Sequence, residues 1–373
     1  MEAQRLSVPS YPASKAAAVL VHPHFARHLG AVPDIETIEA IVDAAFWASL
    51  RREEGYTPRI SLAFVAPGEV TRPLRLERPI PLTPESLTRV SPAVVRPGIH
   101  LGLGREGDEL WVWGATRHLP PFSFVLEVVA PGLLVIKHSR GEESGKFVNI
   151  AVIEGDRVKV VDESAARFPD CPALLYSLLG MESQFTGDGS VSVLIQLAVS
   201  MREHGRGGLL LVVPVNSRQW GESILQPITY SVVPPFTALT ELVYADPPGA
   251  LTGHWQGAMR RAVDGIGGLT AVDGATVITE RYELLAFGAK IVRRPGWAQV
   301  TRVAVTEPIA GTSAETVEPT QLGGTRHLSA AQFAHDQRDA IALVASQDGR
   351  FSVFAWSSCE EMVQARRIES LLL

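Results

Sequence analysis

Apolar residues at helical spacing mark the first clear element of the chain, between residues 35 and 53. The residues that share this spacing are Ile35, Ile38, Ile41, Val42, Ala45, Phe46 and Leu50. Positions three and four apart lie on one face of a helix, so the segment is predicted to be an amphipathic helix. Gly55 and Pro58 end it before a short predicted strand, ISLAFVAP.

Beyond this strand the pattern becomes that of short β-segments. Residues 67–97 contain seven prolines, which favours an irregular connection or an edge structure. Between 98 and 162, Gly, Pro and charged turns separate five apolar runs, and this predicts an antiparallel sheet built from hairpins. The five runs are ELWVWGA, SFVLEVV, GLLVIKH, KFVNIAVI and RVKVV.

A different alternation of helices and strands begins near residue 188. The segment SVSVLIQLAVSMREHG has a helical pattern that ends at a glycine-rich stretch, and the continuous apolar strand LLLVVPV follows. Such a strand is typical of a sheet centre that is buried on both faces. The remaining predicted elements are a helix near 251–264, the strands LTAVDGATVI and YELLAFGAKIV, a helix at 328–336, the strands AIALVAS and FSVFAW, and a last helix from about 358.

This organisation predicts an α/β (α+β) protein of two domains. Residues 1–187 form a β-rich α+β domain, and residues 188–373 form a mixed sheet flanked by helices. A length of 373 residues fits two domains. The expected boundary lies between about 165 and 190.

Composition and charge exclude several function classes. With 34 basic and 40 acidic side chains the net charge is −6, which argues against holding nucleic acid by bulk positive charge. A small acidic or nucleotide ligand remains open. The two cysteines, Cys171 and Cys359, form no CxxC motif. No apolar stretch is long enough to span a bilayer and no signal peptide is evident, so we expect a cytoplasmic protein without a membrane partner.

Two segments of the second half carry candidate chemistry. Asp273-Gly274-Ala275 is expected at the end of a strand, where glycine lets the backbone approach a ligand and the carboxylate can hold a divalent metal. Asp-Gly is also an ordinary turn dipeptide. Gly323-Gly324-Thr325-Arg326-His327 precedes a predicted helix, and free N–H groups there with Thr325 and Arg326 suit a phosphate. A glycine-rich loop with a solvated arginine is the alternative.

Weaker candidates are histidine groups and a short repeat. His22 and His24 either share a metal on a strand or lie in a surface loop, and His335 with Asp336 either forms an acid–base pair or belongs to a solvated helix face. ELWVWGA at 109–115 resembles ELLAFGA at 283–289. So short a match favours coincidence or shared hairpin chemistry over duplication.

Together, the two glycine-containing segments resemble the diadenylate cyclase domain, the N-terminal domain of the DNA-integrity scanning protein DisA. In that family a D-G-A motif and a G-T-R-H-R motif face one ATP. VLIQLAVSMREHGRGGLLLVVP is similar to the family's opening helix and strand, and GGTRHLSAAQFAHDQRDAIALVASQDGRFSVF to its closing segment. The resemblance covers about 188–373. The arrangement of the whole chain resembles DACNV, a branch of cyclase-like proteins proposed to be nucleotide sensors.

The resemblance implies a site and a chemistry. Asp273 would bind Mg²⁺ or Mn²⁺ or orient the attacking hydroxyl, and His327 is a second implied metal ligand. The implied nucleotide contacts are Asp273, Gly274, Ala275, Gly324, Thr325, Arg326, His327 and Ser346. In active members two domains face each other and join two ATP into cyclic di-AMP, so a homo-oligomer is expected.

The chain also departs from the family's pattern. Leu328 stands where the family has a second arginine, and Ser346-Gln347-Asp348 stands where Ser-Glu-Glu is usual. Three functions follow. The first is a nucleotide or cyclic-dinucleotide sensor with an altered site, the second an active diadenylate cyclase, and the third a non-catalytic structural or interaction protein.

Overall fold

The computed structural model describes residues 10–27, 32–52, 55–107, 109–140, 147–162, 193–244 and 253–373. The chain divides into two compact units. Unit 1 is Met1–Asp162 with Leu373, and unit 2 is Glu163–Leu372. Each contains one mixed sheet with helices against it, which confirms the predicted α/β class. The boundary region expected from the sequence lies mostly outside the described residues. Within the described ranges, no helix has the length and hydropathy needed to cross a membrane.

Unit 1 is built on an eight-stranded sheet with the order β2-β4-β3-β1-β5-β6-β7-β8. Its strands are β1 (Ile60–Phe64), β2 (Leu74–Pro81), β3 (His100–Glu106), β4 (Glu109–Thr116), β5 (Phe124–Ala130), β6 (Leu133–Ser139), β7 (Phe147–Glu154) and β8 (Arg157–Val160). β1 and β3 are parallel, and the other neighbouring pairs are antiparallel, as the predicted hairpins require. The proline-rich segment supplies β2 at one edge, where a strand needs fewer backbone donors.

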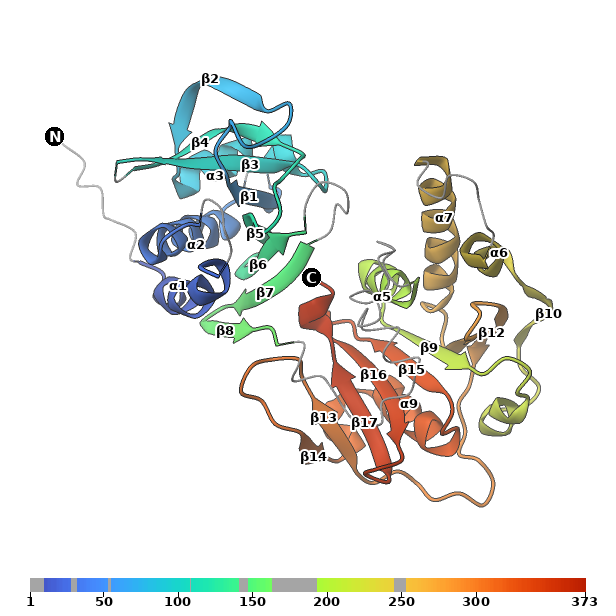
Figure 1. Cartoon of the computed structure of the whole chain (residues 1–373). Helices are drawn as coiled ribbons and strands as arrows, with labels where there is room; N and C mark the ends of the chain where they lie inside the picture. Colours follow the sequence, from blue (N-terminus) through green and yellow to red (C-terminus); the bar gives the residue numbers. More distant parts are fainter. Residues whose placement is uncertain are drawn as a thin grey trace. The chain divides into compact units, whose positions relative to one another are not determined.

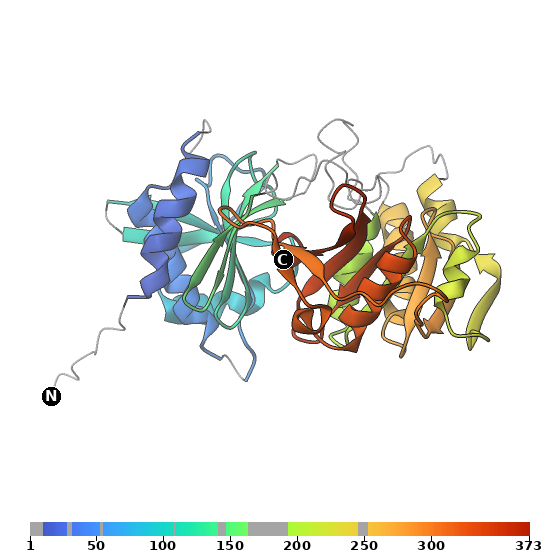
Figure 2. The same cartoon turned by 90° about the horizontal axis from the view of Figure 1, so that it is seen from below.

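Three helices and a 3-10 turn cover one face of this sheet: α1 (Pro12–Phe25), α2 (Ile35–Ser49), α3 (Pro84–Val90) and η1 (Ser91–Val94). α2 begins where the Asp34 carboxylate accepts a hydrogen bond from the Thr37 N–H, at 2.7 Å. It buries its predicted apolar stripe against the sheet. Figure 1 shows α1 and α2 side by side on this face, and Figure 2 shows the same layers from below.

The helix α1 corrects the sequence-based interpretation of the first histidines. His22 and His24 lie in its last turn, in neither a strand nor a loop. The helix buries Ala13, Ala17 and Val21, which are four residues apart. Pro12 is tolerated at its start because the first N–H groups of a helix have no partner within it.

Unit 2 is built on a nine-stranded sheet with the order β10-β12-β11-β9-β15-β16-β17-β13-β14. Its strands are β9 (Gly208–Val213), β10 (Tyr230–Phe236), β11 (Ala275–Thr279), β12 (Leu284–Ala289), β13 (Val303–Thr306), β14 (Glu315–Val317), β15 (Ile341–Ala345), β16 (Phe351–Ser357) and β17 (Met362–Arg367). Every residue of β9 is buried, which confirms the predicted central strand.

Helices cover both faces of the unit 2 sheet. They are α5 (Val193–Glu203), α6 (Ala238–Tyr244), α7 (Gly253–Leu269), α8 (Pro319–Leu322) and α9 (Thr325–Asp336), with the 3-10 turns η4 (Gln219–Ser223) and η5 (Glu369–Leu371). α5 and α7 pack on one face through Leu197, Met201 and Ile266. α9 packs on the other through small residues and Phe333, which lets it lie close to the sheet.

Two predictions in unit 2 are wrong. Residues after 358 form a turn and then β17, not a helix, because the segment pairs with β16 and β13 on its two sides. The predicted strand LTAVDGATVI exists only from Ala275. Leu269 is the last residue of α7, and Asp273 lies in the turn before β11.

The two sheets share one connection pattern. In unit 1, α2 leads into β1, which is parallel to β3, and β2 forms the edge beyond β4. In unit 2, α5 leads into β9, which is parallel to β11, and β10 forms the edge beyond β12. The repeated segments ELWVWGA and ELLAFGA form β4 and β12, which occupy the same place in their sheets. This common position favours duplication over coincidence for the two units.

Candidate functional site

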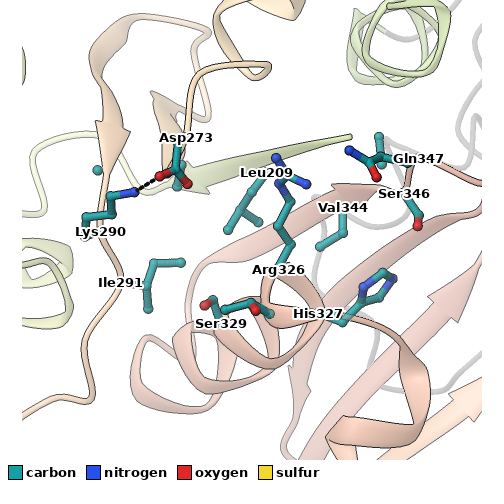
Figure 3. A pocket seen from close by; sticks show the side chains of 16 residues that line it. Leu209, Asp273, Lys290, Ile291, Arg326, His327, Ser329, Val344, Ser346 and Gln347 are labelled. Carbon is teal, nitrogen blue, oxygen red and sulfur yellow. Dashed lines mark hydrogen bonds and ion pairs between the residues drawn. The ribbon is translucent and has the colours of Figure 1, made fainter. Parts of the chain in front are cut away.

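The two candidate segments of unit 2 meet at one cavity of about 560 Å³. Its wall includes all eight residues predicted from the sequence, from Asp273 to Ser346. Other lining residues were not predicted as contacts: Leu209, Ala289, Lys290, Ile291, Ser329, Val344, Ala345 and Gln347. The cavity lies where β9 and β11 begin, β12 and β15 end, and α9 starts (Figure 3).

The start of α9 carries the N–H and guanidinium groups that the sequence analysis associated with a phosphate. Gly324 is the N-cap residue, and Thr325, Arg326 and His327 form the first turn, so the helix starts three residues earlier than predicted. The first hydrogen bond of the helix is donated by the His327 N–H to the Gly324 carbonyl, at 3.0 Å. The N–H groups of Thr325 and Arg326 precede it, and the positive end of the helix dipole lies behind them.

The Arg326 side chain extends from this turn into the cavity (Figure 3). It passes close to Gly207, where an added Cβ would lie 2.8 Å from Arg326 Nη1 and 3.2 Å from the Ala345 carbonyl oxygen. Gly207 also has φ +70°. A glycine there leaves room for the guanidinium between the strand ends.

Asp273 forms an ion pair across the cavity edge with Lys290, which follows β12. Lys290 Nζ lies 2.5 Å from Asp273 Oδ2. The Asp273 side chain is 93% exposed, and the hydrogen bond from Lys290, followed by its charge, lowers the pKa of the carboxyl. Sequence reasoning missed Lys290. The sequence feature that could have pointed to Lys290 is its place directly after an apolar strand. In the structure that strand, β12, is antiparallel to β11, so its end lies beside Asp273.

Gly274 serves the packing of these two strands. It has φ +120°, and an added Cβ would lie 2.5 Å from the carbonyl carbon of Gly288 in β12. Contacts this short do not occur between a real Cβ and backbone, so a side chain here would push the strands apart. The glycine of the Asp-Gly-Ala segment is therefore required by the fold itself.

His327 is buried below the cavity, with 4% of the residue exposed. Its ring lies beside Gly323 and edge-on to Phe354, with ring centroids 6.1 Å apart. Burial is the main cause that lowers the pKa of His327, while Asp348 opposes the shift. The ring is therefore neutral near pH 7, where it adds no positive charge to the cavity.

The metal ligands implied by the resemblance do not form a metal cluster. In the described parts of the chain, no three His, Cys, Asp or Glu side chains converge as metal ligands. Asp273 is the only acidic side chain among the described residues that line the cavity, and Lys290 already occupies one of its oxygens. These residues fit a metal that arrives with a nucleotide better than one held by the protein alone.

The two departures from the family pattern lie in different surroundings. Gln347 lines the cavity, and its side-chain amide donates to the Arg206 carbonyl at 3.3 Å. Ser346 lines it as well, and its N–H donates to the Arg350 carbonyl at 2.9 Å. Leu328 is half-buried in α9 and is not part of the cavity wall.

The histidines that were weaker candidates in the sequence analysis contact other side chains of the fold. His24 Nε2 lies 2.8 Å from His138 Nδ1 in unit 1. His335 Nδ1 lies 2.8 Å from Asp336 Oδ1, so these two side chains form the pair that the sequence analysis left open. The solvated face is wrong, because the His335 side chain is 18% exposed and the Asp336 side chain is buried. Asp336 also accepts a hydrogen bond from the Arg294 N–H at 2.8 Å.

The chain is similar to one family model and to several solved structures. No curated protein matches the sequence. Thirteen chains of solved structures match; one is a crystal structure of a double mutant of DacA from Staphylococcus aureus, with 13% identity, a TM-score of 0.24, and coverage of 46% of this chain and 83% of that chain. Residues 27–117, which include α2 to β4, match the model of the family described as "Probable sensor domain DACNV", and the match covers less than half of the chain.

Proposed function

We propose that unit 2 binds a nucleotide or cyclic dinucleotide in the cavity at Arg326, and that the protein is a nucleotide sensor without cyclase turnover. The region similar to a probable sensor domain would then be the second functional part of the chain. One observation carries the proposal: the cavity joins Arg326, Lys290 and the free N–H groups at the start of α9.

The size and charge of the cavity support a nucleotide-sized anion. Its volume of about 560 Å³ lies within the range of small-molecule sites. Two cations, Arg326 and Lys290, face it with one carboxylate, Asp273. An arginine at a helix start binds phosphate oxygens in the plane of its guanidinium, and the helix N–H groups add further donors. ATP and cyclic di-AMP both carry the phosphates and apolar bases that this wall suits.

The ion pair at Asp273 supports binding over turnover. The cyclase reaction, as the resemblance implies it, uses this carboxylate for a metal or for the attacking hydroxyl. Here the Lys290 ammonium lies 2.5 Å from it, and no other acidic side chain of the described cavity wall replaces it. A metal ion would have to displace a bound cation first. Mg²⁺ or Mn²⁺ would accompany a triphosphate as a companion of the ligand.

Calorimetric titration of the full chain with ATP, GTP and cyclic di-AMP, with and without Mg²⁺ or Mn²⁺, tests the proposal. We expect saturable binding, and mass analysis after incubation should recover unchanged ATP. Arg326→Gln should weaken binding at least about tenfold, the scale of one charge-assisted hydrogen bond. Arg281→Gln is the matched control, because Arg281 is exposed and lies outside the cavity wall.

Two outcomes would contradict the proposal that the protein binds a nucleotide without cyclase turnover. Cyclic di-AMP that forms with the natural chain and disappears with Asp273→Asn would make the protein an active cyclase, and a homo-oligomer with two facing sites would then be expected. Absence of binding for every nucleotide tested would leave the structural or interaction role.

A further inference from the structure

Unit 1 contains a second cavity of about 480 Å³, and none of the residues predicted as ligand contacts lines it. It lies beside the edge strand β2, between α3 with η1 and the strands β3 and β4. Most of its wall is apolar and includes Leu74, Leu76, Ile80, Val90, Leu101 and Val112. The volume is that of a site for a small organic molecule.

The charged residues of this wall, Arg72 and Arg117, are both positive. Arg72 and Arg117 line the cavity together with His118, and all three are exposed to solvent. No acidic side chain is found among the described lining residues. An apolar space with cations at its solvent side is complementary to a molecule that has an apolar body and an anionic end.

The apolar side chains beside the cavity are unusually exposed. Leu74 is 62% exposed and Leu76 is 39% exposed, and both lie on the edge strand β2. Such neighbouring exposed apolar side chains mark a surface that gains from being covered. A ligand body in the cavity would remove them from water.

This cavity is not the unit 1 copy of the cavity in unit 2. In unit 2 the floor consists of Leu209, Ala275 and Val344 at the ends of β9, β11 and β15, on the face that α9 covers. The second cavity lies on the opposite face of its sheet, since Leu101 and Val112 belong to the core beneath α2 and α3.

The unit 1 strands that correspond to the floor carry polar side chains that bind one another. Ser61 Oγ lies 2.7 Å from His100 Nδ1, and Lys137 Nζ lies 2.5 Å from Glu127 Oε2. The part of the unit 1 sheet that corresponds to the floor of the unit 2 cavity is therefore polar, and unit 1 has no apolar floor on that face.

We propose that the cavity between β2, α3 and β4 binds a small amphipathic anion, with its apolar body against Leu76 and Leu101 and its carboxylate or phosphate at Arg72 and Arg117. The site and its ligand class are independent of nucleotide binding in unit 2.

Two fluorescent probes that differ by one charged group test the proposal with the full chain. 1-Anilinonaphthalene-8-sulfonate has an apolar body and an anion, and N-phenyl-1-naphthylamine has the same body without the anion. We expect saturable binding of the sulfonate at one site, tighter than that of the neutral probe. Arg117→Gln and Arg72→Gln should each weaken the sulfonate about tenfold and leave the neutral probe nearly unchanged. Arg78→Gln, on the edge strand β2 but outside the wall, is the control.

A second variant separates this cavity from other apolar surfaces. Ala93 is exposed and lines the cavity, so Ala93→Trp should fill it and abolish binding of both probes without unfolding unit 1. Val95→Trp, on exposed surface outside the wall, should bind both probes as the natural chain does. Sulfonate binding that is unchanged in Arg117→Gln and Arg72→Gln, or that survives Ala93→Trp, would overturn the proposal.

Discussion

A single lysine determines the surroundings of Asp273 at the unit 2 cavity. Lys290 holds this otherwise exposed carboxylate at 2.5 Å and lowers its pKa. The same ammonium also adds one of the two cations of the cavity wall. For the proposed nucleotide site, we therefore expect this ammonium to weaken metal binding and to strengthen phosphate binding.

Lys290→Met should separate these two effects. Without metal, the affinity for ATP should fall several-fold because one cation is lost, and the pKa of Asp273 should return toward its ordinary value. With Mg²⁺ much of the affinity should return, because the carboxylate is then free to meet the metal. Titration calorimetry with and without Mg²⁺ measures both. Arg293→Met, an exposed change three residues away, is the control. An equal loss under both conditions would contradict this role.

His100 makes the stability of unit 1 depend on pH. Burial, and secondarily the Lys137 charge, lower the pKa of His100 to about 4, while Glu127 opposes the shift. The unfolded chain therefore binds a proton at higher pH than the folded chain does. The stabilisation is full above pH 6.5, the ordinary pKa of histidine, and is lost as pH falls toward about 4.

Between pH 6.5 and about 4, the free energy of unfolding of unit 1 should fall by at most about 3 kcal/mol. Urea unfolding at a series of pH values, followed by tryptophan fluorescence, measures it. His100→Gln should flatten this part of the profile, since glutamine does not titrate. Val95→Gln, at an exposed and non-titrating position of the same unit, should leave the slope as it is. A slope that persists unchanged in His100→Gln would assign it to other groups.

At the scale of elements, the cavity depends on how closely two strands and one helix start approach each other. β11 and β12 pass within contact distance at Gly274 and Gly288, and Arg326 passes Gly207. These contacts bring the Asp273 turn and the first turn of α9 to the same wall, although 52 residues separate Asp273 from Thr325 in the chain.

Gly274→Ala should destabilise unit 2 by about 2 kcal/mol or more, because the new Cβ meets the Gly288 backbone and φ is positive. Gly268→Ala is a matched control in α7, where nothing lies within 4 Å of an added Cβ. That change should be neutral or stabilising by about 0.5–1 kcal/mol. Urea midpoints of the two variants give the comparison, and equal midpoints would refute the close approach.

At the scale of the whole molecule, the two units have one strand pattern and different connections. In unit 2 the chain between β12 and β15 carries β13, β14, α8 and α9, whereas a short loop joins β4 to β5 in unit 1. The helix that supplies Thr325 and Arg326 therefore has no counterpart in that loop. The proposed phosphate-binding groups at the start of α9 are therefore specific to unit 2 among the described parts of the chain.

If the units bind separate ligands, each ligand should stabilise its own unit. Scanning calorimetry of the full chain should show that ATP at about 100 times its dissociation constant adds about 2.7 kcal/mol to one transition. At the same ATP concentration, Arg326→Gln should reduce that shift to about 1.4 kcal/mol or less, because its binding is at least about tenfold weaker, and Ala93→Trp should leave the shift intact. A shift of every transition by ATP would contradict separate ligand effects.

Local patterns in the sequence were sufficient for many elements, and the family resemblance pointed to the candidate site residues. The apolar spacing of 35–53 and the buried run of β9 predict their structures because periodicity reports which faces are covered. The eight residues chosen from two motifs and one strand end line one cavity. Their role as ligand contacts stays a prediction.

Other elements could not be predicted because long-range pairing decides them. Residues 358–373 contain Glu, Gln, Ala, Arg and Leu, which favour a helix, yet β17 forms between β16 and β13. β10 contains two prolines and is exposed, so it forms a strand only at the edge of a sheet. In both cases a strand that is distant in sequence supplies hydrogen bonds, β12 for β10 and β13 for β17, whereas β16 directly precedes β17 along the chain.

The sequence by itself therefore determined the fold class, the main hairpins, the buried central strand and the candidate residues around Asp273 and Arg326. Tertiary structure alone decided that Lys290 pairs with Asp273, that Gly274 is required by strand packing, and that the two units share a strand order. The physical reason is that the spacing of apolar residues within one segment already indicates which face is buried. Register, ion pairs and cavities instead depend on which distant segments the folded backbone brings into contact.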